Sequence, residues 1–156
     1  MVISAEHLTV GYGRTTIIDD MTFGPLEEGK VVGLIGPNAA GKSTLVKTIA
    51  GIKKPSQGTC SIVVDGCEVT GKSRTTAIGY VPQDMLTTAS LTAFESIMVS
   101  AKRRGAVDAD PVAATADIME RLNITHLADR MVSDMSGGQR QLVSVAQMLV
   151  RTRASC

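Results

Sequence analysis

The fold is decided by Gly36-Pro37-Asn38-Ala39-Ala40-Gly41-Lys42-Ser43-Thr44, which matches the pattern G-x-x-x-x-G-K-[ST]. The match follows a short apolar run, Val31–Ile35, and opens a segment of helical character, Lys42–Ile49. That order predicts a strand, a glycine-rich turn and a helix. Such a turn holds a phosphate chain with its backbone N–H groups, while Lys42 reaches the β- and γ-phosphates and Ser43 ligates magnesium. A glycine-rich turn that only caps a helix is the alternative, and the flanking strand and helix weigh against it.

The residues before and after this stretch predict further strands. Val2 to Val10 and Ile17 to Phe23 alternate apolar and polar residues around Gly11-Tyr12-Gly13, as a half-buried hairpin-like pair does. Thr59 to Asp65 and Ala77 to Val81 are expected as two more strands, because turn-rich segments separate them.

From about Leu91 the pattern becomes helical. Apolar residues recur at helical spacing in two segments, the second of which follows Asp110-Pro111, a helix N-terminal signal. They are Phe94, Ile97, Met98 and Ala101, and then Val112, Ala116, Met119 and Leu122. Ser136-Gly137-Gly138-Gln139 then precedes Gln141 to Val150, which is apolar enough for a largely buried helix. No linker divides the chain into separately folding domains.

Composition excludes several classes of protein. The 156 residues are 44% hydrophobic and 20% charged, with a net charge of +1, which are values of a globular chain. A nearly neutral chain gives no reason to expect a nucleic acid as partner. The basic run Lys102-Arg103-Arg104 is expected to be a solvated helix end.

Cysteine usage indicates a reducing cytosol, and hydropathy predicts no membrane-spanning segment. Cys60, Cys67 and Cys156 are odd in number and form no C-x-x-C pair, so neither a disulfide framework nor a zinc site is expected. His7 and His126 stand alone and are not expected to bind metal. No apolar run approaches the roughly 20 residues that span a bilayer, and the first residues lack an export signal. If the protein serves a membrane, it does so through a partner.

A second motif, Met135-Ser136-Gly137-Gly138-Gln139, opens the last apolar helix about a hundred residues after the first. Small residues at a helix N-terminus leave N–H groups open to an anion, although a turn that caps a helix is common structure. With both motifs at this separation, the chain resembles the nucleotide-binding subunits of the ATP-binding cassette (ABC) family, whose signature is Leu-Ser-Gly-Gly-Gln. Met135 replaces the leucine, a volume-conserving change.

The resemblance extends to three weaker positions. Tyr12 lies where the family places an aromatic residue that stacks on adenine. Gln83, at the junction to the helical insert, matches a glutamine that contacts magnesium and the attacking water and senses the membrane subunit. Ala39 replaces the more usual glycine of the phosphate loop, and a positive φ there would cost on the order of 1 kcal/mol without preventing binding.

The resemblance implies an α/β fold: a P-loop NTPase core with a mainly parallel sheet, an antiparallel N-terminal β region and a helical subdomain. The expected division is a core with the phosphate loop at about 1–90, a helical subdomain at about 91–136 and a signature helix at 136–150. It implies dimers in which ATP and Mg²⁺ lie between the phosphate loop of one subunit and the signature of the other, so that Lys42 and Ser136 serve one ATP from opposite subunits. Gly36 to Thr44 and Tyr12 then bind ATP on one side, and Ser136, Gly137, Gly138 and Gln139 bind it on the other, with Lys42 and Gln83 catalytic and Ser43 and Gln83 on Mg²⁺.

The family's sequence continues, after the signature helix, into an apolar strand ending in Asp-Glu, which supports magnesium and polarises the attacking water. Here the residues after Val150 are Arg151-Thr152-Arg153-Ala154-Ser155-Cys156. We therefore expect a partial cassette that binds ATP without hydrolysing it, either because the chain was shortened or because it comes from a fragmentary gene.

The implied partners are permease subunits, a second ATP-binding subunit and a substrate-binding protein, at the cytoplasmic face of the membrane. The signature and the compact insert are similar to importers of iron chelates and cobalamin. Two alternatives stay open: a soluble cassette ATPase acting on ribosomes or DNA repair complexes, and a nucleotide-binding fragment without turnover.

Overall fold

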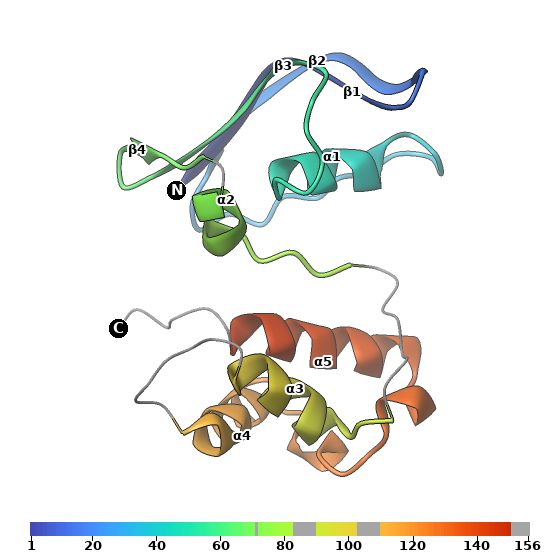
Figure 1. Cartoon of the computed structure of the whole chain (residues 1–156), viewed down its shortest axis with the longest axis vertical. Helices are drawn as coiled ribbons and strands as arrows, with labels where there is room; N and C mark the ends of the chain where they lie inside the picture. The colour runs from blue at the N-terminus through green and yellow to red at the C-terminus, as the bar shows by residue number, and fades with distance from the viewer. Residues whose placement is uncertain (71, 83–89, 103–109, 151–156) are drawn as a thin grey trace. The chain divides into compact units, whose positions relative to one another are not determined.

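The computed structural model describes residues 1–70, 72–82, 90–102 and 110–150. The chain divides into two compact units, Met1–Ile78 and Gly79–Cys156, each with its own hydrophobic core. The first unit is a sheet with helices, and the second is helical (Figure 1). The division of the chain near residue 91 stays a prediction.

The sheet of the first unit contains four strands: β1 (Val2–Tyr12), β2 (Thr15–Glu27), β3 (Gln57–Val64) and β4 (Cys67–Glu68). Their order is β2-β1-β3-β4, and every pair is antiparallel. Tyr12 pairs with Thr15 at the end of the first hairpin, so the pair of strands predicted around Gly11-Tyr12-Gly13 is confirmed. The strand predicted from Thr59 is β3.

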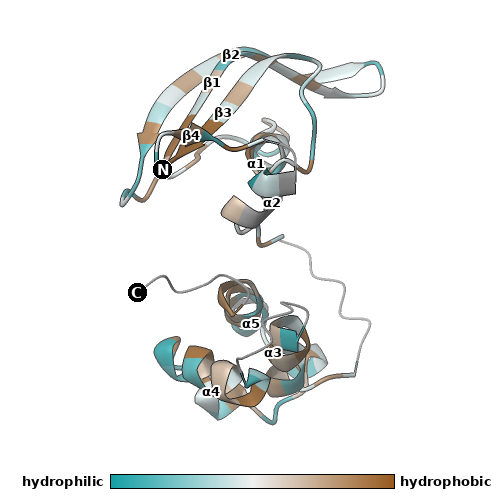
Figure 2. Cartoon of the chain, turned by 60° about the vertical axis from the view of Figure 1, so that its left-hand side comes forward, coloured by the Kyte–Doolittle hydropathy of each residue, from teal (hydrophilic) through white to brown (hydrophobic). Residues whose placement is uncertain are grey.

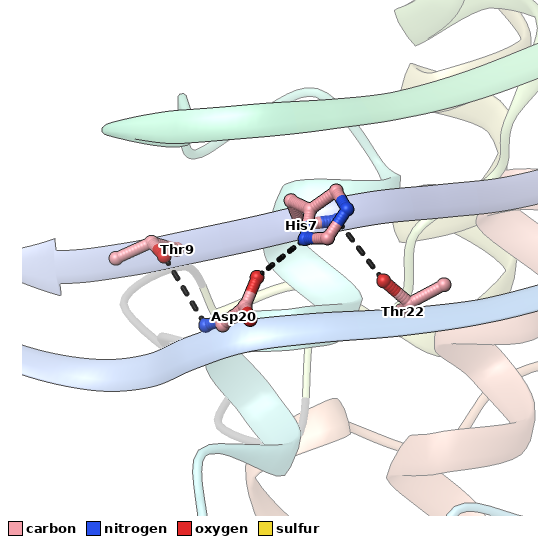
Figure 3. A network of polar contacts seen from close by, with 4 residues as sticks. All are labelled: His7, Thr9, Asp20 and Thr22. Atoms are coloured by element: carbon pink, nitrogen blue, oxygen red, sulfur yellow. Dashed lines mark hydrogen bonds and ion pairs between the residues drawn. The ribbon is translucent and has the colours of Figure 1, made fainter.

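Bulges interrupt the ladder between β1 and β2. His7 and Asp20 both have left-handed backbones, with φ of 49° and 46°, and each lies within a register shift of the ladder. The backbone N–H of His7 donates to Thr22 Oγ1 at 3.1 Å, and that of Asp20 donates to Thr9 Oγ1 at 3.2 Å (Figure 3). His7 Nδ1 lies 2.7 Å from Asp20 Oδ1, and both side chains are exposed. Side chains thus satisfy the polar groups that the bulges remove from the ladder.

Helix α1 (Lys42–Ile49) packs on the sheet and has the predicted bounds. Leu45 joins Leu8, Val10 and Ile18 in the core, and hydrophobic positions of the strands alternate with hydrophilic ones (Figure 2). Helix α2 (Lys72–Ala77) follows the sheet. Arg74 fastens it to the unit, because its guanidinium donates to the carbonyl oxygen of Ile49 at 3.0 Å and to Cys60 Sγ at 2.9 Å.

Two predicted strands are not formed, and with them the parallel part of the expected sheet is missing from the described residues. Val31–Ile35 forms no regular secondary structure and pairs with no strand, and Val31 and Ile35 are almost fully exposed. A parallel strand is hydrogen-bonded to neighbouring strands at its edges and covered on both faces, and the described residues supply no neighbouring strand. The strand predicted at Ala77–Val81 was also wrong, since α2 ends at Ala77 and residues 78–82 pair with no strand.

The second unit contains α3 (Ala93–Lys102), α4 (Pro111–Arg121), η1 (Thr125–Leu127), η2 (Val132–Asp134) and α5 (Gly137–Leu149). The predicted start of α4 is confirmed: Asp110 is the N-cap, its carboxylate accepts from Val112 N–H at 2.9 Å, and Pro111 is the first helical residue. Ile97, Met119 and Val143 bring the three α-helices into one core. In the part of the chain that the structure describes, no helix is both long enough and apolar enough to cross a bilayer.

Candidate functional site

The glycine-rich turn presents exposed backbone in front of α1. Residues 36–40 are exposed, and the turn is closed by the Ala40 N–H, which donates to the Pro37 carbonyl oxygen at 3.3 Å. Gly41 is the N-cap of α1, with φ of 82°, and has no side chain to accept from the first-turn N–H groups. An uncapped helix N-terminus carries partial positive charge, so this end of α1 is suited to an anion.

Lys42 folds back over the turn. Its Nζ donates to the carbonyl oxygens of Gly36 at 2.6 Å and Pro37 at 2.5 Å. The ammonium therefore lies beside the exposed backbone of the turn. The Ser43 side chain is exposed on the same turn of helix, whereas Thr44 is buried. For Thr44, the backbone N–H is thus the group that remains for an anion.

Ala39 has the left-handed backbone that the sequence raised as a condition. Its φ is 67°, a conformation that costs an L-residue with a Cβ about 1–2 kcal/mol. The turn around it is held by the two Lys42 bonds to Gly36 and Pro37 and by the bond from the Ala40 N–H to the Pro37 carbonyl oxygen.

Gly41 is the residue of the turn that tolerates a side chain least. A Cβ would lie 3.0 Å from Ile17 Cγ2 and 3.2 Å from Ile18 Cγ1, and φ is positive. We expect Gly41→Ala to weaken binding of inorganic tripolyphosphate roughly tenfold, because the left-handed backbone alone is worth about 1–2 kcal/mol. Isothermal titration measures the change. Gly33→Ala, outside the turn, is the matched control, since nothing lies within 4 Å of its Cβ and its φ is not positive, and equal losses in both variants would contradict the argument.

Tyr12 lies at the end of β1 with 47% of its surface exposed. The ammonium of Lys53 lies 4.2 Å from the centre of its ring, a contact that the sequence did not predict. Gln83, the predicted magnesium and water ligand, lies outside the described residues.

The second motif opens α5 with reciprocal capping. Ser136 Oγ accepts from the Gln139 N–H at 3.3 Å, and Gln139 Oε1 accepts from the Ser136 N–H at 3.0 Å. Gly137 and Gly138 are exposed, and nothing lies within 4 Å of a Cβ built on either. The backbone at this helix N-terminus is therefore open to a large anion. Lys42 and Ser136 belong to different units.

Two arginines that the sequence reading missed fix the chain leading into this motif. Arg140 Nη1 donates to the Met135 carbonyl oxygen at 2.7 Å, and Arg130 Nη2 donates to that of Asp134 at 3.2 Å. They satisfy two consecutive carbonyl groups and bring positive charge near Ser136. The basic residue directly after Gln139 was the only sequence signal for either.

The described residues of the site are suited to binding a polyphosphate rather than to reacting with it. Backbone N–H groups and Lys42 supply positive charge, and Ser43 offers a hydroxyl oxygen. The described residues contain no group of three or more His, Cys, Asp or Glu side chains that could hold a metal ion. Magnesium is bound by few protein oxygens together with substrate phosphates and water, so the exposed Ser43 hydroxyl beside a phosphate site fits Mg²⁺.

Known proteins resemble this chain in sequence. The sequence model of the family described as "ABC transporter" matches residues 18–154. The linearmycin resistance ATP-binding protein LnrL of Bacillus subtilis is 31% identical over 96% of this chain and 48% of its own length. The ferric enterobactin transport ATP-binding protein FepC of Escherichia coli is 31% identical over 97% of this chain and 58% of its own. This chain thus spans about half the length of the curated relatives it matches.

Solved structures share the fold. CbiO1 of Clostridium perfringens, part of the ABC transporter complex cbiONQ, superimposes with a TM-score of 0.78 at 25% identity, over 96% of this chain and 61% of its own.

Proposed function

The chain belongs to the ABC transporter family, and from that premise we propose that it is the nucleotide-binding part of a subunit that couples ATP binding and hydrolysis to transport across a membrane. One observation carries the proposal. The glycine-rich turn ending at Gly41 leads into the uncapped N-terminus of α1, and the Lys42 side chain folds back across the turn.

Each residue of the turn has a role in binding ATP. The N–H groups of Gly41 to Thr44 donate to phosphate oxygens, and the Lys42 ammonium neutralises the terminal phosphates. Tyr12 stacks on the adenine. Ser43 and Gln83 would hold Mg²⁺, which would neutralise negative charge on the phosphates during phosphoryl transfer. Gln83 also orients the water in a complete site.

The second motif binds the ATP of another subunit. Ser136 and the N–H groups of Gly137 and Gly138 contact its terminal phosphate, and Gln139 contacts the nucleotide beside it. Arg130 and Arg140 keep that helix N-terminus in place through the two carbonyl bonds. Two subunits closing on ATP and reopening after hydrolysis then drive permease partners through alternating access.

The transported substrate is the most specific part of the proposal. We propose import of an iron chelate or a related metal complex, with a substrate-binding protein and permease subunits, and a place for this chain on the cytoplasmic face of the membrane. The relative FepC, a ferric enterobactin transport protein, supports this substrate. The relative LnrL, a linearmycin resistance protein, does not. Genes for a permease and a binding protein beside this one would favour import, and an isolated gene or an export permease would count against it.

A protein of these 156 residues is expected to bind Mg-ATP and to release no phosphate above background. Binding needs the turn and Lys42, which are present, whereas no apolar strand ending in Asp-Glu follows the signature helix in this sequence to orient water. Titration calorimetry measures the binding, and steady-state phosphate release measures the turnover.

The control is a longer chain in which the last residues are replaced by a relative's apolar strand, Asp-Glu pair and remaining domain. Its phosphate release should rise above background. Magnesium-dependent release by the 156 residues, lost on Lys42→Ala, would contradict the expectation.

A further inference from the structure

The aromatic ring proposed to hold the adenine already has a cation on one face. Lys53 Nζ lies 4.2 Å from the ring centre of Tyr12, within the range of an attractive cation–π contact. Tyr12 is 47% exposed, so part of its ring remains open to a ligand. Lys53 is half-buried, whereas its neighbour Lys54 is exposed.

The backbone holds Lys53 in place from both sides. Helix α1 ends at Ile49 and is followed by Gly51, which has φ of 75°. The N–H groups of Ile52 and Lys53 both donate to the Lys47 carbonyl oxygen, at 2.9 and 3.1 Å. Just beyond, the Ser56 N–H and Oγ bond to the Thr9 carbonyl oxygen at 2.8 and 2.9 Å. This short stretch therefore joins the end of the phosphate-loop helix to the strand that carries Tyr12.

A cation on one face of an aromatic ring has two consequences. It limits the rotation of the ring, and it leaves the opposite face for a planar ligand. We propose that Lys53 is a positioning residue for the nucleotide base: it holds the Tyr12 ring so that a purine stacks on the opposite face. The inference rests on the proposed ATP site.

Removing this cation distinguishes binding of the base from binding of the phosphates. Lys53→Met keeps the length of the side chain and removes its charge. It should weaken binding of Mg-ATP about two- to fivefold, the usual range for a partly exposed cation–π contact. Binding of inorganic tripolyphosphate, which has no base, should not change. Calorimetric titration of the full chain with both ligands gives the two affinities.

Three further variants make the assignment specific. Lys54→Met removes the same charge from the adjacent, exposed position and should leave both affinities unchanged. Lys53→Arg keeps a cation over the ring and should restore ATP affinity. In a Tyr12→Ala background, Lys53→Met should have no further effect, because the ring it acts through is gone.

Each contrary outcome has a distinct meaning. Tighter ATP binding by Lys53→Met would overturn the proposal, because Lys53 would then compete with the base for the open face. Unchanged ATP affinity, or an equal loss for tripolyphosphate, would also overturn it while leaving the ATP site standing. Failure of the unaltered chain to bind either ligand would overturn both this inference and the proposed function.

Discussion

Lys42→Ala is expected to weaken binding of Mg-ATP at least about a hundredfold, to the point where calorimetry detects none. The ammonium is the full positive charge that the motif brings to the terminal phosphates, and hydrogen bonds to charged groups contribute about 1.5–3 kcal/mol each. In the structure it already lies at the turn, 2.6 Å from Gly36 O and 2.5 Å from Pro37 O, so little rearrangement precedes its contact with a phosphate.

The control for Lys42 is Lys47→Ala, which removes one lysine from the last turn of the same helix. That variant should bind Mg-ATP with nearly unchanged affinity, and circular dichroism should show that both variants are folded. A folded Lys42→Ala protein with the affinity of the unaltered chain would show that the phosphate turn is not the nucleotide site.

Ile97→Ala is expected to destabilise the helical unit by about 2–5 kcal/mol. Ile97 is completely buried, in the core that α3 shares with α4 and α5, and truncating a buried isoleucine loses its transfer energy and leaves a cavity. Val99→Ala, on the same helix but at a position with 38% of its surface exposed, should cost about 1 kcal/mol or less.

The two tyrosines allow each unit to be followed separately. The chain has no tryptophan, and Tyr12 and Tyr80 lie in different units. In a Tyr12→Phe background, tyrosine fluorescence during urea unfolding therefore reports the second unit. The midpoint for Ile97→Ala should fall well below that for Val99→Ala, and coincident curves would show that this core does not hold the unit together.

Local signals in the sequence predicted local structure well. The start of α4 was predicted from Asp110-Pro111, and the bounds of α1 from the motif and the apolar pattern after it, because caps and turns depend on a few adjacent residues. The strand predicted at Val31–Ile35 does not form because a strand depends on a partner that is distant in sequence, although the local composition suits a strand. The strand predicted at Ala77–Val81 failed for the same reason, since α2 includes Ala77 and residues 78–82 have no partner strand in the described structure.

The candidate site divides in the same way. Lys42, Ser43 and Ser136 were predicted because a motif fixes them by spacing. Lys53 and Arg130 were not, since each acts on a group that the fold brings close and no spacing rule connects them to it. The positive φ of Ala39 was raised only as a condition, because the motif usually has glycine there.

The unpaired segment before the phosphate turn, Val31–Ile35, also affects self-association of the protein in solution. Val31 and Ile35 are almost fully exposed, and Val32 and Leu34 are about half exposed, in an apolar segment without a neighbouring strand in the described structure. Such a segment is a template on which another copy can add a strand. Light scattering should therefore grow with protein concentration, and Val31→Lys together with Ile35→Lys should suppress that growth because lysines at an open edge repel one another.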